Sequence, residues 1–361
     1  MIPFVNIQGQ REAYREELEK AEKAVLDSGI YIGGPEVAAL EAELSAYTGT
    51  NAVTCASGTD ALTIALTALG VQPGDEVVVP DFTFIAPAEC VARLGATPVF
   101  ADITPRTLQI SPESVETLIG PLTRGIIAVD LFGQCAPYGK LREIAQRHGL
   151  WLLEDSAQAF GAMQGGKHAC TLGDMAITSF YPSKPLGCYG DGGAIFTANK
   201  ELAQKVRMLA NHGSEERYLH RIVGTNSRLD ALQAAVLRVK LAHLNAELES
   251  RRKIAERYNQ FFSNIKGLTP QQVADGNTST YAQYTLLADN REEFIAKLDK
   301  AGIPHCIHYP MPLHRQPCFA GTAFQHAGEN VADMASKKAV SLPMCAFTPI
   351  EEIIGKLQEV V

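Results

Sequence analysis

The chain has 361 residues, of which 46% are hydrophobic and 20% are charged, and its formal net charge is −8. This composition is typical of a globular protein and excludes a strongly basic nucleic-acid-binding protein, because no block of Lys and Arg matches a phosphate backbone. We recognise neither an apolar run long enough to span a bilayer nor a signal peptide, so we expect no membrane partner and a cytoplasmic location.

Residues 50 to 200 alternate short apolar runs with helical patterns. Runs rich in Val and Ile that are joined by helices predict an α/β domain, with a mostly parallel sheet covered on both faces. The predicted strands are 52–55, 76–79, 98–100, 125–129, 150–153 and 175–178, and the predicted helices are 61–69, 86–94, 112–119 and 138–148.

After residue 200 the pattern becomes mainly helical, and a long stretch from Asp230 towards Tyr258 predicts a helix that links two domains. A predicted strand at 280–287, a helix at 291–301 and a strand at 304–309 then indicate a smaller α+β unit. A chain of this length exceeds the usual size of one core, so we expect domains at 1–240 and 241–361. No low-complexity linker separates them, which favours domains that pack together.

The cysteines do not indicate a disulfide or metal framework. Eight of them are scattered singly, without a C-x-x-C pair, which favours reduced thiols. His305, Cys306 and His308 lie close together, but no second group of ligands accompanies them at finger-like spacing. We therefore expect no metal site.

A first candidate binding segment is Ser57-Gly58-Thr59-Asp60, which follows a predicted strand and opens a helix. Backbone amides and the helix dipole favour an anion such as phosphate there, whereas a simple helix N-cap is the alternative. The segment lacks the Gly-Lys-Ser/Thr ending of a P-loop. Likewise, Gly190-Asp191-Gly192 lacks the third glycine of a Rossmann fingerprint.

Two further residues carry candidate chemistry. Asp155 follows the run 150–153, at the edge of a parallel sheet where ligands bind. A protonated pyridine nitrogen would be a suitable partner for a buried carboxylate, and Gln158 could bond a neighbouring ring oxygen; a turn or cap role for Asp155 is the alternative. Lys184 lies between two prolines in a loop followed by glycines, which suits an amine that forms a Schiff base; a solvated loop lysine is the alternative.

The chain order of these features resembles the DegT/DnrJ/EryC1/StrS family of pyridoxal phosphate-dependent nucleotide-sugar aminotransferases. The resemblance spans nearly the whole chain and implies the fold of the aspartate aminotransferase superfamily, fold type I, with a smaller C-terminal α+β domain. The segments that carry it are Ser57-Gly58-Thr59-Asp60-Ala61, Phe82-Thr83-Phe84, Glu154-Asp155-Ser156-Ala157-Gln158, Ser179-Phe180 with Lys184, Gly190-Asp191-Gly192-Gly193 and Asn226-Ser227-Arg228-Leu229-Asp230.

The resemblance implies that Lys184 forms the Schiff base with pyridoxal 5′-phosphate and later moves the substrate proton, while Asp155 pairs with the ring nitrogen. Pyridoxamine 5′-phosphate would be the intermediate form of the cofactor. A related branch that removes a hydroxyl carries His in place of this lysine, so Lys184 indicates transamination. The other implied cofactor contacts are Gln158 at the ring hydroxyl, Phe84 at the ring face, Gly58, Thr59 and Ser179 at the phosphate, and Asn226 at the phosphate in the neighbouring subunit of a homodimer.

The segments at 181–193, 281–284 and 308–314 are similar to members that aminate C3 of a sugar. The similarity is greatest to those that act on UDP-2-acetamido-2-deoxy-3-oxo-glucuronate for bacterial O-antigen and lipopolysaccharide biosynthesis, with L-glutamate as the expected donor. Arg228 is a candidate for a substrate carboxylate or for an intersubunit ion pair. His308, Tyr309 and Tyr31 are candidate substrate contacts, and a core strand end is the alternative for the first two.

Other functions remain open from the sequence. Within the family, the acceptor could be a dTDP-3-keto-6-deoxyhexose or a 4-keto nucleotide sugar. Outside it, the chain could be a non-catalytic regulator that binds pyridoxal phosphate. A nicotinamide-dependent sugar oxidoreductase is disfavoured by the missing Rossmann fingerprint.

Overall fold

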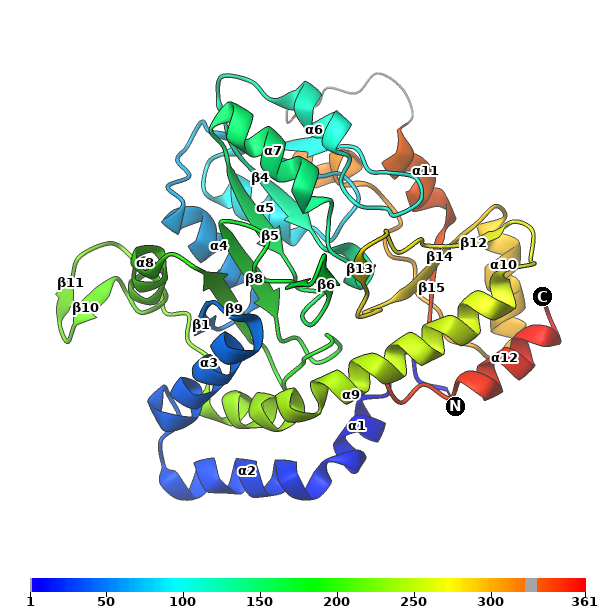
Figure 1. The fold of residues 1–361 in the computed structure, drawn as a ribbon, viewed down its shortest axis with the longest axis horizontal. Helices are drawn as coiled ribbons and strands as arrows, with labels where there is room; N and C mark the ends of the chain where they lie inside the picture. The colour runs from blue at the N-terminus through cyan, green and yellow to red at the C-terminus, as the bar shows by residue number, and fades with distance from the viewer. Residues whose placement is uncertain (1, 322–329) are drawn as a thin grey trace.

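The structure, a computed structural model, describes residues 2–321 and 330–361. A seven-stranded sheet forms the centre of the larger part, and a three-stranded sheet lies in the C-terminal part (Figure 1). The long helix α9 (Ala231–Phe262) runs below both and joins them. The boundary expected between residues 240 and 241 therefore falls inside a continuous helix.

The central sheet has the strand order β1-β9-β8-β5-β4-β2-β3. Its strands from β3 to β8 pair in parallel, and β9 runs antiparallel to β1 and β8. The strands predicted before residue 180 are confirmed, and β9 was not predicted. The bounds are β1 (Asn51–Cys55), β2 (Glu76–Pro80), β3 (Thr97–Ala101), β4 (Thr123–Val129), β5 (Trp151–Asp155), β8 (Met175–Ser179) and β9 (Gly193–Thr197).

Side chains of each central strand alternate between two apolar layers. In β2, Val77 and Val79 pack in one layer, and Val78 packs in the other. One layer includes α4 (Gly58–Ala68), α5 (Ala86–Arg93) and α8 (Lys200–Ala210). The opposite layer includes α3 (Gly34–Thr48), α6 (Pro112–Leu118), α7 (Tyr138–His148) and α9.

The C-terminal part has its own apolar core. The antiparallel sheet of β12 (Leu268–Pro270), β14 (Tyr284–Ala288) and β15 (Ala339–Leu342) packs with α10 (Arg291–Ala301), α12 (Ile350–Gln358) and the end of α9. The predicted strand at 280–287 begins only at Tyr284. The predicted strand at 304–309 is wrong, because in that segment only Cys306 pairs, through one bridge to Ser341. Pro304 and Pro310 flank the segment and have no amide hydrogen with which to extend a ladder.

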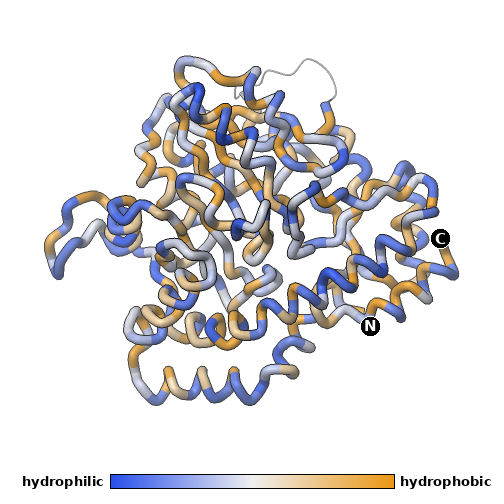
Figure 2. Tube along the Cα trace, viewed as in Figure 1, coloured by the Kyte–Doolittle hydropathy of each residue, from blue (hydrophilic) through white to orange (hydrophobic). Residues whose placement is uncertain are grey.

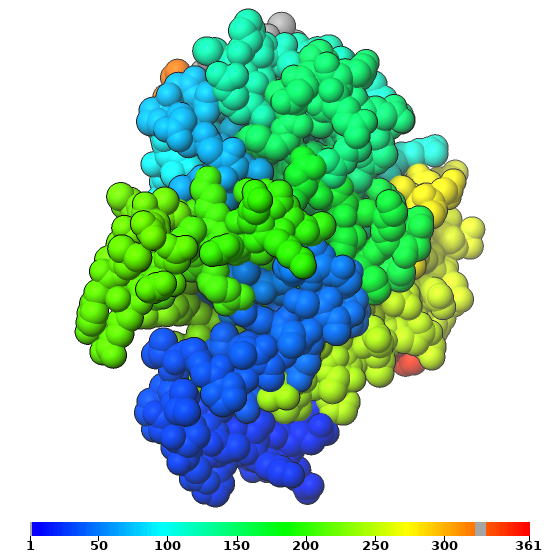
Figure 3. Space-filling model, turned by 60° about the vertical axis from the view of Figure 1, so that its left-hand side comes forward, coloured from blue at the N-terminus to red at the C-terminus, as the bar shows by residue number. Residues whose placement is uncertain are grey.

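The remaining elements lie at the periphery. Figure 2 shows hydrophilic residues along the outer side of α2, and Figures 1 and 3 show the β10–β11 hairpin as an arm that stands out from the body. No helix among the described residues has the length and apolar character needed to cross a membrane. The other bounds are α1 (Ile7–Ala13), α2 (Arg15–Ser28), α11 (Val331–Lys338), β6 (Met163–Gln164), β7 (Lys167–His168), β10 (Ser214–Glu216), β11 (Leu219–His220) and β13 (Asn277–Thr278), with 3₁₀ turns at Leu131–Gly133, Leu313–Arg315 and Pro317–Phe319.

We expect Leu244→Ala to lower the free energy of unfolding by about 2–5 kcal/mol. Leu244 is 1% exposed on α9 and packs in the layer that holds Phe160 and Phe196, so its truncation leaves a cavity. Urea unfolding of the purified protein measures this loss. Leu122→Ala, at a position that is 52% exposed, is the control and should change stability by less than about 0.5 kcal/mol. Equal losses in both variants would contradict the packing of α9 on the sheet.

Candidate active site

A pocket of about 550 Å³ lies at the carboxyl ends of β4, β5 and β8, the sheet edge at which the sequence predicts a ligand. It brings together most of the predicted site residues, namely Gly58, Thr59, Phe84, Asp155, Gln158, Ser179, Lys184, His308 and Tyr309. A wider groove of about 830 Å³ between α2, α3 and α9 contains none of these residues. Because the predicted chemical groups lie in the smaller pocket and not in the groove, the smaller pocket is the candidate active site.

The first turn of α4 forms one wall of the pocket. Ser57 is the N-cap, and its hydroxyl accepts a hydrogen bond from the Asp60 amide, so the capping interpretation is correct. The cap does not exclude an anion, because the other first-turn amides have no acceptor within the helix. A Cβ atom on Gly58 would lie 2.7 Å from the Cβ atom of Ser179. Glycine thus allows Ser179 to approach the helix start, where both residues face the same space.

Asp155 and Lys184 both line the pocket and influence one another. Asp155 is 4% exposed at the end of β5 and accepts a hydrogen bond of 3.0 Å from the Ala157 amide. Burial raises the pKa of Asp155 to about 6, although this amide and the nearby Lys184 charge oppose the shift. Burial lowers the pKa of Lys184, and the Asp155 charge opposes that shift. A buried acid and an amine whose pKa is lowered by burial therefore lie in one cavity.

Gln158 is held in a defined orientation by the protein. Its Oε1 atom accepts a hydrogen bond of 2.7 Å from the Phe132 amide, and its Nε2 atom lies 3.3 Å from the Tyr309 hydroxyl. Because its oxygen is already bonded, the side chain of Gln158 would act towards a ligand as a hydrogen-bond donor. Phe84 is 54% exposed and lies 6.4 Å from the Tyr309 ring, centroid to centroid, which leaves an aromatic surface open in the pocket.

His308 forms part of the wall contributed by the C-terminal part. Its Nδ1 atom lies 2.9 Å from the Ser341 hydroxyl, and its ring is 6.0 Å from the Phe4 ring. Burial, reinforced by the Lys184 charge, lowers the pKa of His308 to about 4. His308 is therefore a neutral imidazole at physiological pH, and it can serve as a hydrogen-bonding group rather than as a cation.

Sequence reasoning missed two polar groups of the pocket. Thr83 is 2% exposed, and neither its hydroxyl nor the Oε1 atom of Gln283 has a hydrogen-bond partner within the described residues. Unpaired buried polar atoms are costly in a folded protein, so their position in the pocket indicates that a ligand completes them. Thr83 and Gln283 both lie within segments that carry the resemblance, but no pattern in the sequence distinguishes their polar atoms.

Three predicted site residues do not line the pocket of this single chain. Tyr31 is 49% exposed, and its carbonyl accepts a hydrogen bond from the Ala231 amide. Asn226 and Arg228 are exposed on either side of the buried Ser227, whose hydroxyl donates to Asp60 at the start of α4. The roles expected for Tyr31, Asn226 and Arg228 therefore stay predictions.

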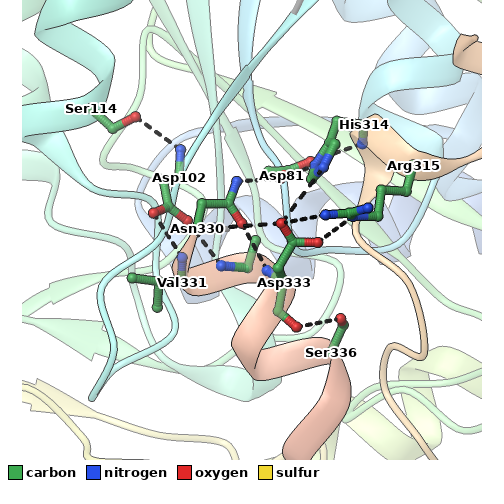
Figure 4. Close-up of polar contacts among 10 residues, drawn as sticks. Asp81, Asp102, Ser114, His314, Arg315, Asn330, Val331, Asp333 and Ser336 are labelled. Atoms are coloured by element: carbon green, nitrogen blue, oxygen red, sulfur yellow. Dashed lines mark hydrogen bonds and ion pairs between the residues drawn. The ribbon is translucent and has the colours of Figure 1, made fainter. Parts of the chain in front are cut away.

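A polar network supports the wall that carries Phe84 (Figure 4). Asp81, directly after β2, is fully buried; it accepts a hydrogen bond of 2.9 Å from the His314 amide and lies 2.6 Å from the His314 ring. Asn330, the N-cap of α11, donates to the same carboxylate at 3.2 Å. The network thereby attaches α11 and the segment around His314 to the end of β2. Its members are spread along the chain, so no local motif reveals them.

We expect Asp155→Asn to raise the free energy of unfolding of the ligand-free protein at pH 8 by up to about 3 kcal/mol. The pKa of Asp155 rises from 3.8 to about 6 on folding, so the folded state binds this proton more tightly than the unfolded state does. The ionised carboxylate therefore destabilises the fold increasingly as the pH rises from about 4 to about 6. Urea unfolding across this range checks the difference, which should vanish at low pH, and the exposed Asp27→Asn should show no such trend.

The sequence matches the DegT/DnrJ/EryC1/StrS aminotransferase family over residues 12–357. It is 47% identical to the UDP-2-acetamido-2-deoxy-3-oxo-D-glucuronate aminotransferase of Pseudomonas aeruginosa, with 95% of both chains covered. It is 44% identical to the pleiotropic regulatory protein of Geobacillus stearothermophilus, over 95% of this chain and 93% of the relative. It is also 42% identical to the dTDP-3-amino-3,4,6-trideoxy-alpha-D-glucose transaminase of Streptomyces venezuelae, over 95% and 91%.

Solved structures agree with this match. A DegT DnrJ EryC1 StrS aminotransferase from Brucella abortus superposes with a TM-score of 0.96 at 40% identity, covering 99% of both chains. DesV of S. venezuelae, solved in complex with a ketimine intermediate, gives 0.96 at 40% identity over 99% and 98%. NtdA from Bacillus subtilis with bound cofactor PMP gives 0.87 at 29% identity over 96% and 82%. The expected fold type I is confirmed, and the chain belongs to the DegT/DnrJ/EryC1/StrS aminotransferase family.

Proposed function

We propose that this protein is a pyridoxal 5′-phosphate-dependent aminotransferase that moves the amino group of L-glutamate to the 3-keto carbon of UDP-2-acetamido-2-deoxy-3-oxo-glucuronate. The observation that carries the proposal is the meeting of Lys184 and Asp155 in one pocket, with opposite pKa shifts. The 47% identity to the P. aeruginosa enzyme favours this acceptor. We place the reaction in the cytoplasm and in bacterial O-antigen biosynthesis.

The residues of the pocket fit the cofactor. Asp155 is a buried carboxylate that lacks a full counter-charge, which suits a protonated ring nitrogen, and the open face of Phe84 suits the ring itself. Gln158 would donate to the ring hydroxyl. The start of α4, with Gly58 and Thr59, and the facing Ser179 would hold the phosphate. When bound, the cofactor supplies a carbonyl carbon for amines and a ring that accepts electrons.

Lys184 performs the two tasks that the chain itself must supply. The lowered pKa of Lys184 favours the unprotonated amine, and only that form is a nucleophile. As an unbound amine, the Nζ atom of Lys184 could then act as the general base that accepts and returns the substrate proton. The ionised Asp155, in the same pocket, would hold a protonated ring nitrogen when the cofactor is bound.

The electrostatics of the pocket favour a second copy of the chain. The ionisable side chains that line the pocket in one chain are those of Lys184, Asp155, Asp191, His308, Tyr181 and Tyr309, and Lys184 is the only Lys or Arg among them. The proposed acceptor carries a diphosphate and a carboxylate, so further positive or hydrogen-bonding groups are required. Asn226 and Arg228 are exposed beside the start of α4.

The β10–β11 hairpin and the segment after it expose apolar side chains. Tyr218 is 82% exposed and Val223 is 94% exposed, as expected of a surface that is covered in a homodimer.

Two alternatives have a specific observation in their favour. The 42% identity to a dTDP-amino-sugar transaminase supports a dTDP-3-keto-6-deoxyhexose as the acceptor. A test of acceptors should also include other keto sugars, among them 4-keto nucleotide sugars. The 44% identity to a pleiotropic regulatory protein supports a regulator that binds the cofactor without turnover.

Adding pyridoxal 5′-phosphate to the protein is expected to give a visible absorption band that L-glutamate removes in the absence of any sugar. The band would be lost because glutamate would leave its amino group on the cofactor as pyridoxamine 5′-phosphate and depart as 2-oxoglutarate, and the amine form lacks the conjugated imine that absorbs visible light. Lys184→Ala should lower the rate of amine transfer by about 10³-fold or more, whereas the exposed Lys253→Ala should leave it unchanged. Absorption spectra and single-turnover kinetics measure both effects.

The outcomes separate the alternatives. No band after addition of the cofactor would refute the aminotransferase proposal, and a band that every amino donor leaves unchanged would favour the regulator. Regeneration of the band by one of a panel of UDP- and dTDP-linked 3-keto and 4-keto sugars identifies the acceptor.

If Asn226 completes the site of a partner subunit, mixing Lys184→Ala with Asn226→Ala should restore about a quarter of wild-type activity, since half of the dimers are mixed and each contains one intact site. Neither variant alone should be active at that level. Light scattering of the mixture checks the dimer. Full activity of Asn226→Ala by itself, or a monomeric active protein, would contradict this arrangement.

A further inference from the structure

Lys240, on α9, is a buried cation outside the pocket. Its side chain is 2% exposed, and its ammonium group donates a hydrogen bond of 2.7 Å to the Gly187 carbonyl. The same nitrogen lies 4.2 Å from the centre of the Tyr189 ring. Within the described residues it forms no ion pair with a carboxylate. A lysine is rarely buried in this way, because the loss of hydration is costly unless the charge has a specific partner.

The partners of Lys240 belong to the loop that carries the candidate nucleophile. Residues 180–192 connect β8 to β9, and Lys184 lies near the start of this loop. Gln233, two turns before Lys240 on α9, accepts a hydrogen bond of 2.8 Å from the Tyr189 amide. Helix α9 therefore contacts the loop at Gly187 and at Tyr189, while Lys184 lies on the pocket side of the same loop.

The loop has little freedom to satisfy the Gly187 carbonyl by other means. Gly187 is buried, and a Cβ atom at this position would lie 2.6 Å from the Pro182 carbonyl oxygen, so the chain folds tightly on itself there. Without Lys240, the Gly187 oxygen would be a buried acceptor with no donor, and the loop would have to open to water to satisfy it. The lysine thus fixes a backbone position three residues from Lys184.

We propose that Lys240 is a positioning residue for the amine-transfer reaction: its ammonium group holds the Gly187 carbonyl and the Tyr189 ring, and thereby fixes the loop that presents Lys184 to the pocket. The inference rests on the proposed function of Lys184. Lysine suits this role because one group serves both as a charged hydrogen-bond donor and as a cation over an aromatic face.

The charges around Lys240 are compatible with this role. Burial lowers the pKa of Lys240 to about 8, and the surrounding Glu247, Cys188 and Glu22 oppose that shift. The group therefore remains largely protonated at neutral pH. Glu247 is itself bound by the amide of Gln10, at 2.8 and 2.9 Å, so it does not withdraw the ammonium group from the loop.

The test compares Lys240→Met, which keeps the length and apolar stem of the side chain, with Lys253→Met, which removes an exposed lysine on the same helix. Hydrogen exchange of the cofactor-free protein reports the loop directly, and we expect faster exchange in residues 184–190 for Lys240→Met alone. In single turnover with L-glutamate, the maximal rate should fall by about 10-fold, while the glutamate concentration at half-maximal rate changes by less than about twofold. We expect the rate to fall more than the half-maximal concentration changes, because the variant would lose the alignment of Lys184 and keep the binding of glutamate.

A folded Lys240→Met protein with wild-type exchange and a wild-type rate would overturn the proposal. If this variant does not fold, Tyr189→Leu and Tyr189→Phe decide the matter, because only the first removes the ring beneath the cation. A slower rate for Tyr189→Leu alone supports the proposal, and equal rates for both overturn it. Failure of the wild-type protein to react with glutamate would instead refute the proposed function, while the exchange measurement would still test the loop.

Discussion

The site depends on a negative charge held inside the sheet. Asp155 ends β5, a central strand whose neighbours β4 and β8 leave it little access to water. The Ala157 amide and the Lys184 charge compensate the carboxylate only in part, so its pKa remains above the usual range. The same burial lowers the pKa of Lys184. Both shifts favour the uncharged forms, and a cationic ring placed against Asp155 would relieve the unfavourable burial of its charge.

A pair of buried acids, Asp130 and Glu154, lies close to Asp155. The hydroxyl of Ser156 is 2.7 Å from both the Asp130 and the Glu154 carboxyl groups. A hydroxyl has one hydrogen to donate, so a proton on one of the two carboxyl groups would satisfy both contacts. Burial raises the pKa of both, and the Glu154 charge raises that of Asp130 further. These shifts favour a proton shared within the pair, and such a proton would limit the repulsion of the Asp155 carboxylate.

Helix α9 connects the two sides of the pocket. Its first half contacts the Lys184 loop through Gln233 and Lys240, and its second half contributes Tyr258 and Phe262 to the C-terminal core. Buried Arg251 donates to the Tyr281 carbonyl at 3.0 Å, close to the segment that carries Gln283. One rigid element thus sets the distance between the loop that carries the amine and the wall that carries His308 and Tyr309. An aminotransferase, which first takes an amino group from a donor and then gives it to an acceptor, requires precise placement of its catalytic groups.

The amino-acid sequence predicts the alternation of strands and helices, and it predicts a ligand at the sheet edge where the structure brings Gly58, Asp155 and Lys184 into one pocket, because residues after parallel strands meet at one edge. Local patterns could not determine the wall at His308 and Tyr309, where a predicted strand proved to be an irregular segment between prolines. Nor could they mark Thr83 and Gln283 as unpaired, or join Asp81 to His314. These features depend on tertiary packing, since they arise where the C-terminal part packs on the sheet, and periodicity reports local burial but not which distant side chains meet.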